Sequence, residues 1–158
     1  MFLSKPQKSF TRKTPEIPKQ ALSILGKGFF AYLGTTEPGC DPHLTVMFYI
    51  WDEGSESIYL VSTRRSRKVT NIRRNTRVCV TVDERDPKSP AGNCGVMIQG
   101  RAHLVEMEIA DDIVMVNFLD KYIHFLGPGY PMGSRIAIRI TPQKISYWKG
   151  ANFFKWER

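Results

Sequence analysis

The chain lacks any hydrophobic run of the roughly 18 residues that a membrane-spanning helix requires. Its first residues, Met1 to Lys5, lack the apolar stretch of a secretory signal, so neither export nor membrane insertion is expected. Cysteine is scarce: Cys40, Cys79 and Cys94 form no CxxC pair and no disulfide framework. Unpaired cysteines fit a reducing compartment, so we expect a cytoplasmic protein.

The common catalytic and nucleotide-binding motifs are also missing. The sequence has no Walker loop, no Rossmann glycine pattern and no GxSxG motif. Its histidines, His43, His103 and His124, stand at spacings that do not suit a metal site. We therefore predict no metal site, and the sequence names no catalytic residue.

Positive charge is in excess, with 23 Lys and Arg against 15 Asp and Glu and a formal net charge of +8. Such a balance suits an anionic partner: nucleic acid, acidic lipid or a phosphorylated small molecule. The prolines and basic residues of the first 18 positions predict a mobile basic arm over residues 1–18. The remainder, residues 19–158, is long enough for a single domain.

Short aromatic and β-branched runs between turn residues predict an antiparallel sheet. The expected strands are residues 29–36, 43–51, 57–62, 77–82, 95–105, 135–140 and 144–148. The expected helices are residues 18–25, 68–75 and 108–125. No alternation of strand and helix indicates a parallel sheet, so the fold class is mainly β with flanking helices, as a small antiparallel barrel.

The most informative stretch joins the third expected strand to the second expected helix. A helix start presents free backbone N–H groups and the positive end of the helix dipole, so it attracts anions. Ser62, Thr63 and Ser66 add hydroxyl donors there, and Arg67 and Lys68 add charge. Together they suit a terminal phosphate, while a solvated basic helix is the alternative.

The order of these elements resembles the FMN-binding split β-barrel of the pyridoxamine 5′-phosphate oxidases and their relatives. The resemblance rests on the Ser-Arg-Lys loop and on a long strand that ends in Gly-Arg-Ala at residues 100–102, and it covers roughly residues 29–104 and the final strand. It implies an antiparallel split β-barrel that binds FMN. By this resemblance, the residues that hold the FMN phosphate are Ser62, Ser66, Arg67 and Lys68, and we expect the neighbouring hydroxyl of Thr63 to bind the cofactor as well.

The C-terminal segment Ser-Tyr-Trp-Lys-Gly, residues 146–150, is similar to the family's late tryptophan segment. The resemblance implies that Trp148 of one subunit approaches the flavin of the other, although a core or interface role is the alternative. Arg158 stands ten residues beyond Trp148, a spacing at which the oxidases carry a flavin-contacting arginine. Trp148 points to a site shared between subunits, and Arg158 to a further contact with the flavin.

The chain departs from the true oxidases at their substrate site. Phe154 and Trp156 stand where the oxidases carry an Arg-x-His, and Gly95 stands in place of a glutamine. Leu44 and Tyr49 replace an early arginine and lysine. We therefore expect an FMN-binding oxidoreductase that acts on a small-molecule substrate other than pyridoxamine phosphate.

The expected strand 43–51 is apolar on both of its faces, which is more than a half-solvated strand needs. A homodimer would bury the second face in one isologous contact. The alternative is that the helix expected over residues 108–125 covers that face within one chain.

Other functions stay open at this point. The same barrel binds a deazaflavin coenzyme or haem in some relatives, and a flavin-storage protein without turnover is possible on the same residues. A nucleic-acid-binding module is the alternative from a different class. Its support is the basic arm together with three aromatic residues expected to be exposed: Phe153, Phe154 and Trp156.

Overall fold

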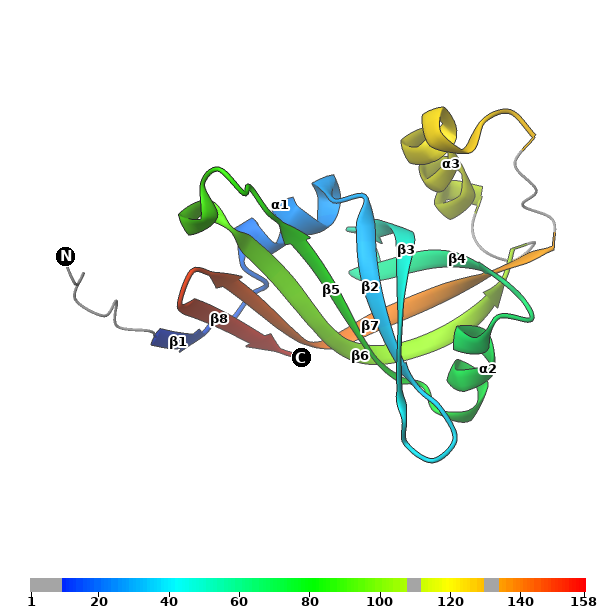
Figure 1. Ribbon diagram of the computed structural model, residues 1–158, viewed down its shortest axis with the longest axis horizontal. Coiled ribbons are helices and arrows are strands. Elements are labelled where there is room, and N and C mark those ends of the chain that lie inside the picture. The colour runs from blue at the N-terminus through cyan, green and yellow to red at the C-terminus, as the bar shows by residue number, and fades with distance from the viewer. Residues whose placement is uncertain (1–9, 108–111, 130–133) are drawn as a thin grey trace.

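The computed structural model describes residues 10–107, 112–129 and 134–158. Within these residues, eight strands form one sheet in the order β1-β8-β7-β4-β3-β2-β5-β6, and β7 also pairs with β6 (Figure 1). The strands are β1 (Phe10–Lys13), β2 (Phe30–Thr36), β3 (Pro42–Asp52), β4 (Ser57–Thr63), β5 (Arg77–Glu84), β6 (Cys94–Glu106), β7 (Arg135–Lys149) and β8 (Asn152–Glu157). The pairing of β7 with both β4 and β6 closes six strands into a barrel, so the expected split β-barrel is confirmed.

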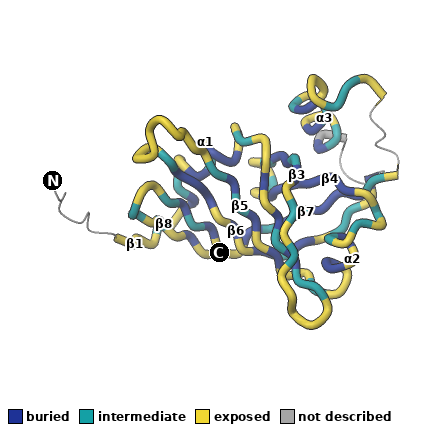
Figure 2. Tube along the Cα trace, viewed as in Figure 1, coloured by how far each residue is buried: buried dark blue, intermediate teal, exposed yellow. Residues whose placement is uncertain are grey.

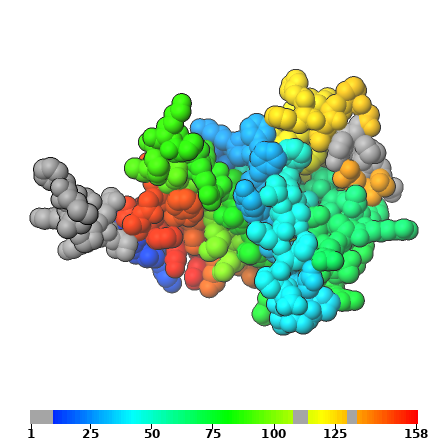
Figure 3. Space-filling view, viewed as in Figure 1, coloured from blue at the N-terminus to red at the C-terminus, as the bar shows by residue number. Residues whose placement is uncertain are grey.

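Three helices pack on this barrel: α1 (Lys19–Lys27), α2 (Arg67–Arg74) and α3 (Asp112–Leu126), and a short 3-10 turn spans Pro90–Gly92. The apolar faces of α1 and α2 join the barrel's interior cluster, and the two helices lie toward opposite ends of the barrel (Figure 1). α3 instead lies on the outside, against β3 (Figure 3).

The position of α3 explains why β4 is buried along both of its faces, as the dark trace of Figure 2 shows. Ile58 and Leu60 point into the barrel, while Tyr59 and Val61 point outward. The outward side chains form a second apolar cluster with Phe118 and other residues of α3. β4 and its neighbours β3 and β7 therefore separate the barrel core from the α3 cluster.

The two strands expected over residues 135–140 and 144–148 form one strand, β7, which continues through Pro142. A proline lacks the N–H that a central strand must donate, so the sequence predicts a break at Pro142. The ladder between β6 and β7 shifts register between Gln99 and Gly100, so Pro142 lies at an irregularity. A side chain at Gly100 would collide with the carbonyl of Thr141, so glycine permits this close approach.

The C-terminal residues form an eighth strand that the sequence did not predict. Trp156 of β8 is buried in the barrel core, Phe154 is half-buried and Phe153 is exposed. The interpretation of all three as exposed aromatics is therefore wrong for Trp156, because pairing of β8 with β7 turns its ring inward.

From residue 10 onward, the structure differs from the mobile N-terminal arm that the sequence predicts. Phe10–Lys13 forms β1, which pairs in parallel with β8 and covers its free edge. Ile17 is buried in the core. Residues 10–18 are therefore docked on the domain, and the rest of the expected arm lies outside the described residues.

Candidate functional site

The predicted phosphate loop lies at the junction of β4 and α2. Ser62 is 3% exposed, and its Oγ lies 2.9 Å from Oγ of Ser66, the residue before the helix. Within the described part of the chain, no side chain caps the first turn of α2. The N–H groups of that turn are therefore available to an anion.

Lys68 is the second residue of α2, and its half-buried side chain points into the same space. Partial burial lowers the pKa of the Lys68 ammonium from its ordinary value. Less water around a charge strengthens its attraction to a bound anion. Ser62, Ser66 and Lys68 thus form one cationic and hydroxyl-rich corner.

This corner opens into a cavity of about 260 Å³. Its polar end carries Thr63 and Arg135 in addition to Ser62 and Lys68. The remaining walls are apolar, and their residues are Phe30, Val46, Met47, Phe48, Val61 and Phe118. Such a cavity suits a ligand with an anionic group at one end and a flat apolar body.

The sequence did not predict the apolar walls of this cavity or the presence of Arg135 in its lining. Phe118 reaches the cavity from α3, and Arg135 reaches it from the start of β7. Neither position carries a local motif, because both enter the site through long-range pairing of β7 and packing of α3.

Arg67 does not join the corner. Its Nη1 lies 3.2 Å from Oε1 of Glu37, which follows β2, and the Arg67 side chain is largely exposed. The structure therefore brings together Ser62, Thr63, Ser66 and Lys68 from the predicted loop and directs Arg67 to a surface ion pair.

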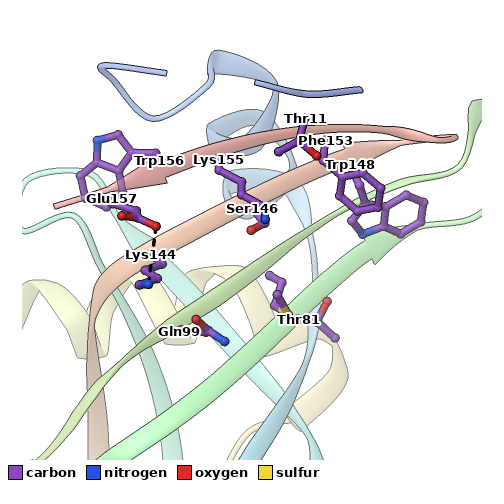
Figure 4. Close-up of a pocket in the computed structure, with 11 residues that line it drawn as sticks. Thr11, Thr81, Gln99, Lys144, Ser146, Trp148, Phe153, Lys155, Trp156 and Glu157 are labelled. Atoms are coloured by element: carbon purple, nitrogen blue, oxygen red, sulfur yellow. Dashed lines mark ion pairs between the residues drawn. The ribbon is translucent and has the colours of Figure 1, made fainter. Parts of the chain in front are cut away.

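Trp148 lies near the far end of β7, beside a groove of about 560 Å³ (Figure 4). Its indole packs against Gly95 of β6, where a Cβ would lie 2.7 Å from the indole Nε1. In Figure 4 Trp148 and Phe153 stand at one end of the groove and Lys144 and Glu157 at the other. Gly95 thus makes room for the tryptophan.

Arg158 is held at three points. Its Nη2 lies 3.0 Å from Oε2 of Glu56, its guanidinium lies over the ring of Trp156, and its N–H donates to the carbonyl of Gln143. Glu56 lies in the turn before β4, so Arg158 and the phosphate loop lie at opposite ends of β4.

Trp148 and the phosphate loop are likewise far apart within one chain. Ser62 pairs with Ile136, and Trp148 lies twelve residues further along β7. At about 3.3 Å per residue, that contour is roughly 40 Å. Consistent with this, Trp148 does not line the cavity at Lys68.

Tyr49 and Trp156, which the resemblance aligns with substrate-site residues of the oxidases, have structural roles here. Tyr49 is fully buried, and its hydroxyl donates to the carbonyl of Leu25 at 2.8 Å, which ties β3 to α1. Burial raises the pKa of the Tyr49 hydroxyl well above its ordinary value. Trp156 belongs to the core.

Known proteins of the same fold were found among solved structures. A conserved hypothetical protein from Mycobacterium tuberculosis is 25% identical, with a TM-score of 0.70 and 85% of each chain covered. An F420 reductase is 23% identical, with a TM-score of 0.66 over 82% of this chain and 98% of the other. An FAD-binding protein from Mesorhizobium loti is 21% identical, with a TM-score of 0.66 over 84% and 94%. None of the curated proteins matches the chain.

The family model described as pyridoxamine 5′-phosphate oxidase matches residues 17–149, which is most of the chain. The chain therefore belongs to the pyridoxamine 5′-phosphate oxidase family, as the resemblance predicted. Among the residues that the structure describes, no group of His, Cys, Asp and Glu side chains could hold a metal ion. No helix of the described chain has the length and apolar character that a membrane crossing requires.

Proposed function

We propose that this protein is an FMN-dependent oxidoreductase whose substrate is a small molecule other than pyridoxamine phosphate. The observation that carries the proposal is the corner formed by Ser62, Ser66 and Lys68 at the uncapped start of α2, open to an apolar cavity. Membership of the oxidase family supports the same function.

The residues present fit FMN. The corner offers hydroxyl and N–H donors and one ammonium to a phosphate dianion, and a charge-assisted bond of this kind contributes roughly 1.5–3 kcal/mol. The rings of Phe30 and Phe48 stack with centroids 5.1 Å apart, which gives an apolar wall for a planar ring system.

FMN supplies hydride transfer when it is bound. The chain's own residues then have three tasks: Lys68 and the two serines fix the phosphate, the aromatic wall orients the ring, and the apolar lining excludes water. None of these tasks needs an acid–base residue, which agrees with the lack of a catalytic motif.

A deazaflavin coenzyme is the second candidate for the same cavity. The observation in its favour is the shared fold with an F420 reductase. Absorbance and mass of the cofactor extracted from the purified protein distinguish the two, because oxidised FMN and a deazaflavin differ in both.

The proposed working unit is a homodimer in which Trp148 and Arg158 of one subunit approach the flavin of the other. Support comes from an exposed apolar face on β2 and β3, where Leu44 is 67%, Phe30 53% and Val46 52% exposed. Contiguous apolar surface of this kind marks an interaction site. α3 covers Ile50 but leaves Leu44 and Val46 open, so it does not replace a second copy.

We further propose that the protein works in the cytoplasm. Cys40, Cys79 and Cys94 are all free thiols. Two of them, Cys40 and Cys79, are exposed, which suits a reducing compartment.

The decisive experiment on the site is FMN binding by the Lys68→Ala variant. Loss of the ammonium should raise the Kd on the order of tenfold to a hundredfold. The matched control is Arg73→Ala with Arg74→Ala, which removes exposed charge from the last turn of the same helix. An unchanged Kd in Lys68→Ala would remove the phosphate assignment.

A further inference from the structure

A second polar groove lies on the outside of the barrel, between the β2–β3 hairpin and strands β5, β6 and β7. It measures about 680 Å³. Three strands each contribute one cation to its lining: Arg77 from β5, Arg101 from β6 and Lys144 from β7. Among the described residues that line it, none is a carboxylate.

The two arginines are direct cross-strand neighbours. Arg77 pairs with Arg101 in the β5–β6 register. The next residues along the strands, Val78 and Ala102, are buried in the core, so both arginines project to the outer face. Like charges at directly opposed positions destabilise a sheet. A bound anion would reduce the repulsion between the two guanidiniums.

No carboxylate compensates them within the described chain. Arg101 donates to the hydroxyl of Thr76 at 3.2 Å, and neither Arg101 nor Arg77 forms an ion pair there. Lys144 does have a partner, since its Nζ lies 3.5 Å from Oε1 of Glu157. The arginine pair therefore carries the uncompensated charge.

The groove also provides room and neutral donors. At Gly34 its floor has no side chain, and a Cβ there would lie 2.5 Å from the Sγ of Cys79. Gln99 and Gln143 add amide groups to the walls. The groove shares no lining residue with the cavity at Lys68.

We propose that this groove binds a small polyanion, a ligand with two or more phosphate or carboxylate groups, at a site separate from the cofactor loop. A guanidinium binds phosphate or carboxylate through two parallel hydrogen bonds. Two guanidiniums on opposed positions each take one anionic group of the same ligand. This inference does not depend on which flavin occupies the other cavity.

The test is titration of the purified full-length protein with pyrophosphate at constant ionic strength, followed by calorimetry. The variant is Arg77→Gln with Arg101→Gln, and the matched control is Arg73→Gln with Arg74→Gln, which removes equal charge from exposed positions. We expect pyrophosphate affinity to fall about tenfold or more in the variant and to stay unchanged in the control.

Two further measurements separate this site from the others. FMN affinity should be equal in wild type and variant, so a failure here is distinct from a failure at Lys68. In the absence of ligand, the Tm of the variant should equal or exceed that of wild type, because a like-charge pair has been removed.

Three outcomes overturn the proposal. The first is equal pyrophosphate affinity in wild type and variant. The second is no binding of pyrophosphate by wild type at millimolar concentration. The third is binding of a single-stranded oligonucleotide that is lost in the variant while pyrophosphate does not compete, which would assign the groove to nucleic acid.

Discussion

At the scale of single residues, the missing side chain of Gly95 decides where Trp148 lies. The indole occupies the space that a Cβ at Gly95 would need. We expect Gly95→Ala to move the ring off β6, to shift tryptophan emission to longer wavelength and to weaken FMN binding several-fold.

The matched control is Gly26→Ala, because a Cβ at Gly26 of α1 would meet nothing within 4 Å. This substitution should leave emission and FMN affinity unchanged and stabilise the helix by about 0.5–1 kcal/mol. Identical emission spectra for wild type and Gly95→Ala would contradict the packing of Trp148 on Gly95.

Sequence patterns predicted the residues of the phosphate corner, since Ser62, Ser66 and Lys68 are close in the chain. They did not predict the direction of Arg67, because its partner Glu37 belongs to a turn thirty positions away. Sequence patterns did not predict the burial of Trp156 either, because that burial depends on pairing of β8 with β7.

At the scale of elements, the neighbouring residues Lys121 and Tyr122 attach α3 to the barrel. The hydroxyl of Tyr122 donates to the carbonyl of Phe29 at 2.9 Å and accepts from the N–H of Tyr49 at 3.0 Å. The ammonium of Lys121 donates to the carbonyl of Gly28 and lies 4.7 Å from the ring centroid of Tyr49. These contacts join α3 to the ends of β2 and β3.

Removal of the Tyr122 hydroxyl should loosen this attachment. In Tyr122→Phe the buried N–H of Tyr49 and the carbonyl of Phe29 lose their partner, at a cost of about 1–3 kcal/mol. Urea unfolding measures the loss, and Tyr32→Phe on the exposed face of β2 is the control. Equal stabilities of the two variants would contradict a structural role for the hydroxyl.

Lys121 gives the attachment a pH dependence. Burial lowers the pKa of the Lys121 ammonium from 10.5 to about 8. Between these values the unfolded chain holds the proton and the folded chain does not, so the free energy of unfolding rises with pH. Burial raises the pKa of Tyr122 from 10.0 to about 12, which has the opposite effect above pH 10.

Between pH 8 and pH 10, the change in the free energy of unfolding therefore reports on Lys121 and not on Tyr122. We expect the free energy of unfolding of wild type to rise through this window relative to that of Lys121→Met. Urea unfolding at pH 8, 9 and 10 measures the difference. Parallel pH profiles of wild type and variant would show that Lys121 keeps its ordinary pKa.

At the scale of the whole molecule, the exposed face of β2 and β3 predicts association. We expect Leu44→Asp to yield a monomer with weakened FMN binding, because the charge falls in the proposed contact and Leu44 does not line the cavity at Lys68. Val116→Asp is the control, since Val116 of α3 is also an exposed apolar residue, 53% exposed against 67% for Leu44. Sedimentation at micromolar concentration is the measurement, and a wild-type monomer that binds FMN tightly would disprove the shared site.

The sequence was enough for the barrel class and for the positions of β2 to β6, because each of these strands carries its own apolar pattern between turn residues. The sequence did not predict which strands pair with one another. Pairing of Phe10–Lys13 with β8 and passage of β7 through Pro142 both depend on contacts between distant segments. The distance between Trp148 and Ser62 follows from that pairing, so it too needed the structure.

The double pairing of β7 has a consequence for how the protein is made. β7 follows β2 to β6 in the chain, yet it joins β4 to β6 and closes the barrel. A nascent chain that ends before Arg135 therefore exposes two unpaired strand edges and the interior of an open sheet, which invites aggregation. Folding must wait for β7 to emerge, so ribosome-bound chains should remain protease-sensitive until translation has passed this strand.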